Sequence, residues 1–227
     1  MRFGAQVQAL PRHVAASERL SLLAIKVVAA AVMDAQGRVL IAERPAGKHL
    51  AGRWEFPGGK LESGEERRTG LKRELHEELG IAVTGTPRPL IRLEHTYPDK
   101  HVHLDIFVVR RYQGEPQGRE GQALRWVSQD ELQTVELLPA DGPIVAALRL
   151  PERLTQMIVG ELRGVPCEGM ADAMAASDAG ADFLVLLHEL PHGEVRAICE
   201  LVPVPVYARG MELEAAWELG ATGVVER

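Results

Sequence analysis

Alternating and continuous apolar positions predict two β-hairpins. Residues 23–33 form a run rich in alanine and valine, the turn signal Asp34–Gly37 follows, and apolar side chains then alternate over 38–43. Two short strands joined by a glycine-containing turn are typical of a hairpin. Residues 88–97 and 101–111 alternate on either side of a proline-containing turn, so we expect a second hairpin there.

A helical pattern lies between the two hairpins. Leucine recurs at every fourth position from Leu71 to Leu79, and Gly80 ends the run. Ser63 and Glu66 have the spacing of a capping box, in which side chains bond the free amides at a helix start. The spacing predicts a helix of about four turns that follows a glycine-rich loop.

The pattern is less regular at the two ends of this region. Residues 1–22 have no clean period, and we expect a mobile tail or one short helix. Ser128 and Glu131 form a second capping box, and the Asp141–Pro143 turn opens a further helix. That helix is expected to close a first domain over residues 23–150.

The remaining residues, 151–227, follow a different rule. Helical stretches alternate there with short, continuously apolar strands. Strands that are apolar on both faces and separated by helices are typical of a parallel sheet. We therefore expect an α/β chain with a second module. Its expected helices are 169–179, 193–201 and 211–219, and its expected strands are 182–187, 204–208 and 224–225.

Composition places the chain among ordinary folded proteins. Its 227 residues are 46% apolar and 26% charged, which excludes disordered and low-complexity classes. The apolar run Leu22–Met33 is too short to cross a bilayer and contains Lys26, so we expect a cytoplasmic protein without a membrane partner. Cys167 and Cys199 are too distant for a metal knuckle and too few for a disulfide framework, so we expect two inert thiols.

Charge is distributed unevenly between the modules. Residues 1–150 hold 21 Lys and Arg against 19 Asp and Glu, whereas residues 151–227 hold 5 against 13 and contain no lysine. An acidic surface repels polyanions, so a polyphosphate ligand is expected on the first module. A nucleic acid polymer is not an expected partner.

Three carboxylates are candidate metal ligands. Glu74, Glu77 and Glu78 fall within an arc of roughly 100° on the predicted helix. Like charges at this spacing repel each other, and they become favourable when a hard cation such as Mg²⁺ or Mn²⁺ lies among them. The alternative is a solvated acidic face on which Arg73 pairs with Glu77.

The wider spacing resembles the Nudix box. The resemblance covers about residues 23–150 and implies an α/β/α sandwich, in which a loop, a helix and a loop present the box at the end of a mixed sheet. Members of this family hydrolyse nucleoside diphosphates linked to another moiety, with divalent cations. The matched positions are Gly59, Glu65, Arg73, Glu74, Leu75, Glu77, Glu78, Gly80 and Ile81.

The resemblance implies a role for each box residue. Glu77 and Glu78 would ligate metal together with the carbonyl of Gly58 or Gly59. Glu74 would be the general base or a further ligand. Bound metal would lower the pKa of a water molecule and align it for in-line attack on phosphorus.

Arg73 is expected to hold these carboxylates in place as part of the catalytic machinery. Glu65 is its expected partner on the same resemblance. A carboxylate in the first helical turn also interacts favourably with the helix dipole, so this second interpretation of Glu65 stays open.

The flanking runs resemble 8-oxo-dGTP diphosphatases of the MutT type. The similar runs are IAERPAGKHLAGRWEFPGGKLE, YPDKHVHLDIF, GEPQGREGQ and LLPADGPIVAAL. On this match Arg44 and Phe56 would line a purine pocket. Lys60 would meet phosphate, and Glu120 would add a carboxylate to the metal site. From the residues alone, Phe56 is equally a core residue and Arg44 a surface residue.

Asp141 departs from the pattern in the expected base pocket. The MutT type has an asparagine there that reads the purine edge, whereas an aspartate accepts hydrogen bonds and donates only when protonated. Asp141 is also a good N-cap residue for the helix that follows it. The reaction type is therefore better defined by the sequence than the preferred substrate.

Three hypotheses for function follow. The first is Mg²⁺-dependent hydrolysis of 8-oxo-dGTP or a related purine nucleoside triphosphate to monophosphate and pyrophosphate, which sanitises the nucleotide pool. The second keeps this chemistry but takes a nucleoside diphosphate sugar, a dinucleotide or a capped RNA end. The third is a nucleotide-sensing module without turnover, which the intact glutamates argue against.

His95, His101 and His103 lie on the second hairpin, and alternation puts His101 and His103 on one face. A metal site there needs a third ligand, which the sequence does not identify. We therefore expect ordinary strand residues.

Residues 165–226 resemble the last part of thiamine monophosphate synthase, a (β/α)₈ barrel. Such a barrel takes about 250 residues, and only 77 follow Leu150. That family's phosphate-binding double glycine is Arg209–Gly210 here, so we expect a degenerate segment without synthase activity. Its sheet must be covered, either by the first domain or by a second copy in a homodimer.

Overall fold

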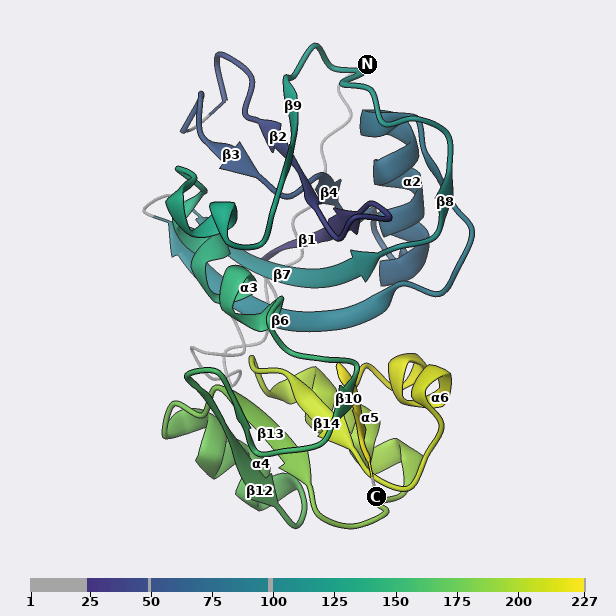
Figure 1. The fold of residues 1–227 in the computed structure, drawn as a ribbon, viewed down its shortest axis with the longest axis vertical. Coiled ribbons are helices and arrows are strands. Elements are labelled where there is room, and N and C mark those ends of the chain that lie inside the picture. The colour runs from purple at the N-terminus through teal and green to yellow at the C-terminus, as the bar shows by residue number, and fades with distance from the viewer. Residues whose placement is uncertain (1–23, 49, 98–99, 227) are drawn as a thin grey trace, which may run out of the picture.

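The computed structural model describes residues 24–48, 50–97 and 100–226 (Figure 1). The expected tail, residues 1–22, lies outside these described residues. Two parts lie end to end, an N-terminal part up to residue 150 and a C-terminal segment after it. Among the described residues, no helix is long and apolar enough to cross a bilayer.

Both predicted hairpins are present in the mixed sheet of the N-terminal part. Its strands are β1 (Ile25–Met33), β2 (Val39–Glu43), β3 (Trp54–Glu55), β4 (Gly58–Lys60), β6 (Arg88–Tyr97), β7 (Lys100–Val109) and β9 (Leu124–Val127). Their order is β3-β2-β1-β7-β6, with β4 and β9 paired to β1 and β2. The inner strands of the two hairpins, β1 and β7, are parallel, while the pairs within each hairpin are antiparallel. A separate two-stranded sheet joins β5 (Ala82–Val83) to β8 (Tyr112–Gln113).

One helix covers each face of the mixed sheet. The leucine stripe of α2 (Arg67–Leu79) is buried with Val28, Ala30 and Val32 of β1. The intervening β1 residues face the opposite core, which includes α3 (Gly142–Ala147). Strand alternation thus divides β1 between two cores, and the predicted α/β/α sandwich is confirmed.

The start of α2 differs from the prediction by three residues. Glu66 is the N-cap, and its carboxylate accepts a hydrogen bond from the amide of Thr69 at 3.0 Å. The predicted cap at Ser63 is therefore wrong, because a later side chain satisfies the first free amides. At the other end, Gly80 adopts the left-handed conformation and donates to the carbonyl of His76, as the sequence predicts.

The second predicted capping box is confirmed. Ser128 and Glu131 exchange hydrogen bonds between side chain and amide. They open a single 3₁₀ turn, η1 (Glu131–Thr134), and a second such turn, η2 (Pro139–Asp141), leads into α3.

The C-terminal segment is a curled half-barrel with the predicted alternation of helices and parallel strands. Its helices are α4 (Met170–Asp178), α5 (His192–Leu201) and α6 (Leu213–Glu218). Its strands are β10 (Arg153–Leu154), β11 (Ile158–Val159), β12 (Leu162–Cys167), β13 (Phe183–Leu186), β14 (Val206–Ala208) and β15 (Gly223–Val225). The order is β10-β15-β14-β13-β12-β11, and all neighbours are parallel except β11 and β12. The strands β10 to β12 were not predicted.

The sheet face that points away from the helices is covered by the segment leading into it. Phe183, Val185 and Tyr207 point to this side and pack with Leu150 and Leu154. The other face buries Cys167 and Cys199 among the helices, where both are free thiols. Both faces of the half-barrel are therefore covered within one chain.

Arginines of the N-terminal part face acidic residues and carbonyls of the C-terminal segment. Exposed ion pairs contribute little stability individually, but their arrangement places positive side chains of the N-terminal part opposite acidic side chains of the C-terminal segment. The described residues therefore show cover by the same chain and give no support for a homodimer through this segment. The contacts are Arg67 with Glu200, Arg68 with Glu218, Arg92 with the Glu200 carbonyl, Arg110 with Glu152 and Arg111 with Glu214.

A buried arginine joins the two parts. Arg88 on β6 is 5% exposed, and its Nε donates to the carbonyl of Thr222 at 2.9 Å. Its Nη2 donates to the carbonyls of Leu150 and Pro151 at 3.0 and 2.9 Å. The hydroxyl of Thr222 returns a bond to the carbonyl of Leu90 at 2.9 Å. The junction between the parts is therefore held from both sides.

Replacement of this arginine should destabilise the whole chain. We expect Arg88→Met to lower the free energy of unfolding by about 2–4 kcal/mol, because the buried carbonyls of Thr222 and Leu150 lose their donor. Urea denaturation followed by circular dichroism measures this. Arg110→Met is the matched control at an exposed ion pair and should cost less than about 0.5 kcal/mol. Equal effects of the two substitutions would contradict the role given to Arg88.

Candidate active site

Two glycines bring the backbone of β4 against the carboxylates of α2. The amide of Gly58 donates to Glu78 Oε2 at 3.0 Å. A Cβ on Gly58 would lie 2.1 Å from the carbonyl oxygen of Val28, and one on Gly59 would lie 2.2 Å from Glu74 Oε2. The backbone of β1 leaves no room for a side chain at Gly58, and a side chain at Gly59 would displace the carboxylate of Glu74. The backbone of β4 therefore lies directly against the predicted carboxylates.

Arg73 donates hydrogen bonds to three carboxylates of the box. Its Nε and Nη2 donate to the two oxygens of Glu65 at 2.9 and 2.8 Å. Its Nη1 donates to Glu74 Oε1 at 2.9 Å and to Glu77 Oε2 at 3.1 Å, and Nη2 also reaches the carbonyl of Lys60 at 3.1 Å. The hydrogen bonds from Arg73 lower the pKa of Glu65 to about 2. Glu65 thus partners Arg73, as the resemblance implies.

Glu78 is the most perturbed carboxylate of the box. Burial, together with the charges of Glu120, Glu55 and Glu74, raises its pKa to about 7, against the hydrogen bond from Gly58. Desolvation and nearby like charges both disfavour the ionised form. This electrostatic environment would be relieved by a cation placed among the carboxylates.

The loop that carries Glu120 is fixed to the end of α2. The amide of Arg119 donates to the carbonyl of Glu78 at 3.0 Å, and Gln122 Nε2 donates to the same carbonyl at 3.3 Å. These bonds satisfy a carbonyl that has no helical partner at a C-terminus. Glu120 also pairs with Lys48 at 3.2 Å. The charge of Glu120 acts on Glu78, and the role of Glu120 as a metal ligand stays a prediction.

A second polar group surrounds Asp141. Arg44 forms an ion pair with Glu55, which the sequence reasoning missed. Asp141 is 3% exposed, and its Oδ2 has no hydrogen-bond partner among the described residues. Burial raises the pKa of Asp141 to about 8, helped by Glu55 and opposed by Arg44. Asp141 occupies the N-cap position of α3, as the sequence predicts, but its side chain makes no capping hydrogen bond.

Phe56 and Lys60, the other two residues predicted to contact substrate, differ in burial. Phe56 is 5% exposed and packs in the core on the α3 face of the sheet, with Ile41 and Val127. The side chain of Lys60 is exposed at the end of β4, and the backbone carbonyl of Lys60 accepts a hydrogen bond from Arg73. The structure therefore supports the core interpretation of Phe56.

Comparison with known proteins identifies the family. The NUDIX domain model matches residues 28–147, just over half of the chain. The chain belongs to the Nudix family. The 8-oxo-dGTP diphosphatase of Escherichia coli K12 is 36% identical over 128 residues, which cover 55% of this chain and 96% of that protein. The CTP pyrophosphohydrolase of the same strain is 40% identical over 120 residues, covering 53% and 88%. The solution structure of the E. coli ORF135 protein, 40% identical, superposes with a TM-score of 0.50 and covers 56% and 91%.

These matches fall on the N-terminal part. The Nudix model ends at residue 147, so the resemblance of residues 165–226 to thiamine monophosphate synthase stays a prediction. Nudix hydrolases use divalent metal ions, and the donors gathered here fit such an ion because all of them are oxygens. The carboxylates come from Glu74, Glu77, Glu78 and Glu120, beside the backbone of Gly58 and Gly59.

The buried Asp141 should make stability depend on pH. Its pKa is raised from 3.8 to about 8, so its contribution to stability is complete below about pH 4 and is lost as the pH rises through about 8. Asp141→Asn removes this titration. We expect the difference in unfolding free energy between wild type and variant to move in favour of the variant from about pH 5 to about pH 9, measured by urea denaturation.

Asp130→Asn, at an exposed aspartate, is the control and should show a constant difference. A constant difference for Asp141→Asn as well would mean that this carboxyl titrates normally.

Proposed function

We propose that the chain is a Mg²⁺-dependent Nudix pyrophosphohydrolase that acts on oxidised purine nucleoside triphosphates, with 8-oxo-dGTP as the first candidate. The observation that carries this proposal is the set of carboxylates around Glu78, held against the backbone of Gly58 and Gly59. Its oxygen donors suit Mg²⁺ or Mn²⁺. The relative from E. coli named 8-oxo-dGTP diphosphatase supports the substrate class.

The residues of the box divide the work. Glu77, Glu78 and Glu120 would hold the cation with the carbonyl of Gly58 or Gly59. When bound, the cation neutralises phosphate charge and makes a bound water more acidic. Glu74 accepts a proton of the attacking water, and the bond between the attacked phosphorus and the oxygen that bridges the α- and β-phosphates breaks. Arg73 keeps Glu74 and Glu77 in position throughout.

The group around Asp141 is the proposed base-reading site. A carboxyl with a pKa of about 8 is protonated at neutral pH, so Asp141 both donates and accepts a hydrogen bond. Its unpartnered Oδ2 leaves that capacity for a ligand. Arg44 and Lys60 are the proposed contacts to base and phosphate, and Arg44 is positioned by its pair with Glu55.

A pyrimidine triphosphate is the second candidate. The relative named CTP pyrophosphohydrolase is 40% identical to this chain, slightly more than the 8-oxo-dGTP diphosphatase at 36%. The chemistry at phosphorus would be unchanged, because only the base differs. A substrate panel must therefore contain CTP beside the purines.

The test is pyrophosphate release from a panel of 8-oxo-dGTP, dGTP, CTP, a nucleoside diphosphate sugar and a dinucleotide. We expect Mg²⁺-dependent release with 8-oxo-dGTP preferred. Glu78→Gln should reduce kcat by about 100-fold or more while leaving stability unchanged or higher, since it removes a buried charge among like charges.

Glu62→Gln, at an exposed position before α2, is the matched control and should keep normal turnover. Release that is independent of metal, or an active Glu78→Gln variant, would remove the box from the mechanism. Nucleotide binding without release would instead identify a sensing module.

Base recognition has a separate test. Asp141→Asn should change the ratio of kcat/KM for 8-oxo-dGTP to that for dGTP by several-fold, and change kcat for either by less. The substitution alters hydrogen bonds at the base and leaves the phosphate site intact. If both substrates lose the same factor, or neither changes, Asp141 does not read the base.

A further inference from the structure

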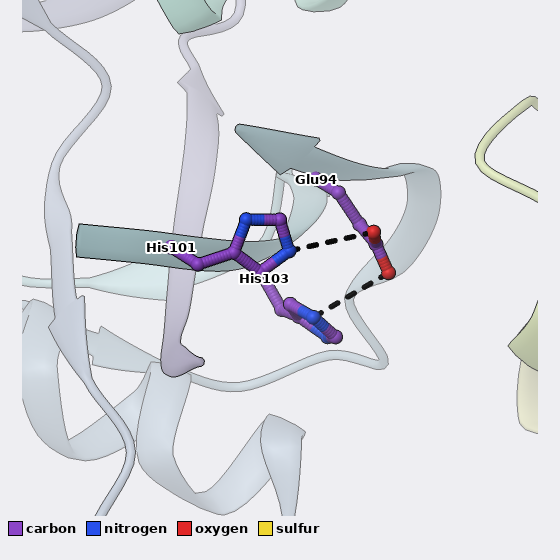
Figure 2. A group of neighbouring side chains, drawn as sticks. All are labelled: Glu94, His101 and His103. Atoms are coloured by element: carbon purple, nitrogen blue, oxygen red, sulfur yellow. Dashed lines mark ion pairs between the residues drawn. The ribbon is translucent and has the colours of Figure 1, made fainter. Parts of the chain in front are cut away.

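Two histidines and a glutamate converge on one face of the second hairpin, outside the Nudix box. In the antiparallel register of β6 and β7, Glu94 lies opposite His103 and Thr96 lies opposite His101. Residues two apart on a strand share a face, so all four side chains lie on the same side. Figure 2 shows the two imidazoles and the carboxylate pointing toward one another. The cross-strand register supplies the third ligand that the sequence alone does not identify.

The distances suit a metal ion with nitrogen and oxygen ligands. His101 Nε2 lies 3.5 Å from Glu94 Oε2, and His103 Nε2 lies 3.4 Å from Glu94 Oε1. One ligand atom from each of the three residues lies within 4.8 Å of the others. Bonds of about 2.0–2.1 Å in a tetrahedron separate neighbouring ligand atoms by about 3.4 Å. The side chains therefore need little movement to enclose an ion.

Two contacts distinguish this group from an ordinary surface ion pair. Thr96 Oγ1 lies 2.7 Å from His101 Nδ1, which holds the ring with its other nitrogen toward Glu94. Such a second partner on the far nitrogen is typical of metal-binding histidines. His103 Nε2 is buried and has no hydrogen-bond partner among the described residues. A bound cation would give this buried nitrogen the partner that it lacks.

Two charged residues, Asp105 and Lys26, lie next to this group and are not part of it. Asp105, the next residue on the same face of β7, is held by Arg92 at 2.8 Å and by Arg67 at 3.2 Å, so it is not a further ligand. Lys26 lies beside His103 in the parallel pairing of β1 and β7. Glu94 is 57% exposed, which gives an ion access from solvent.

We propose that Glu94, His101 and His103 form a binding site for a transition-metal cation, with Zn²⁺ as the first candidate. Imidazole and carboxylate ligands suit Zn²⁺ better than Mg²⁺, which prefers oxygen ligands alone. Three protein ligands leave at least one coordination position open. Glu94 and His103 line a groove of about 1000 Å³ between the Nudix domain and α5, from which an ion can reach them.

The experiment uses the full chain, freed of metal with a chelator and kept in excess Mg²⁺. We expect Zn²⁺ titration by calorimetry to give one site that survives in Glu78→Gln, a variant that weakens the Nudix box. His101→Gln and His103→Gln should weaken this binding by about 100-fold, and Thr96→Val by about 10-fold or more. His95→Gln, on the opposite face of β6, is the matched control and should bind within about twofold of wild type.

Two further readouts separate ligation from folding. Co²⁺ should give the visible absorption of a tetrahedral site in wild type and lose it in His103→Gln. Zn²⁺ at about 100 times its dissociation constant should raise the Tm of wild type by about 5 °C or more, and leave that of His103→Gln unchanged. Mg²⁺-dependent hydrolysis should be the same in both.

Absence of Zn²⁺ binding would overturn the proposal. Binding that is lost in Glu78→Gln but kept in His103→Gln would also overturn it, because the ion would then occupy the Nudix box. These outcomes do not depend on which nucleotide the enzyme hydrolyses.

Discussion

One guanidinium keeps like charges together on the face of α2. Arg73 forms a two-pronged contact with Glu65 and single contacts with Glu74 and Glu77, so repulsion among these carboxylates is offset without any bound ion. Glu78 receives its hydrogen bond from the Gly58 amide instead. Arg73 thus binds three carboxylates of the box, whereas Glu78 is bound by a backbone amide. A cation would stabilise the ionised form of Glu78, which burial and neighbouring like charges disfavour.

Strand β1 sets the position of the glycines relative to α2. Its first half pairs with β4 and its second half with β2, so the glycine-bearing strand enters the sheet beside α2. Alternate β1 residues fill separate cores above and below. Because one strand sets the position of the glycines, the helix and both cores, the sheet fixes Gly58 and Gly59 against the carboxylates of α2, whereas Glu120 reaches them from a loop.

Short-range patterns predicted most elements, and long-range contacts account for what was missed. Leucine spacing and a terminal glycine located α2, and continuous apolar runs located the parallel strands of the half-barrel. The strands β10 to β12 escaped because they are short and interrupted by residues such as Arg163 and Pro166. The box residues were predicted from spacing, whereas the burial of Asp141 and the position of Glu94 opposite His103 depend on tertiary packing and register.

The buried Arg88 has a consequence for motion. It binds the carbonyls of Leu150 and Pro151, where a flexible linker would otherwise allow the parts to swing, and it binds Thr222 on the far side of the junction. Rotation at this point would leave a guanidinium in an apolar interface without acceptors. The buried bonds of Arg88 therefore oppose a hinge motion between the two parts at this junction.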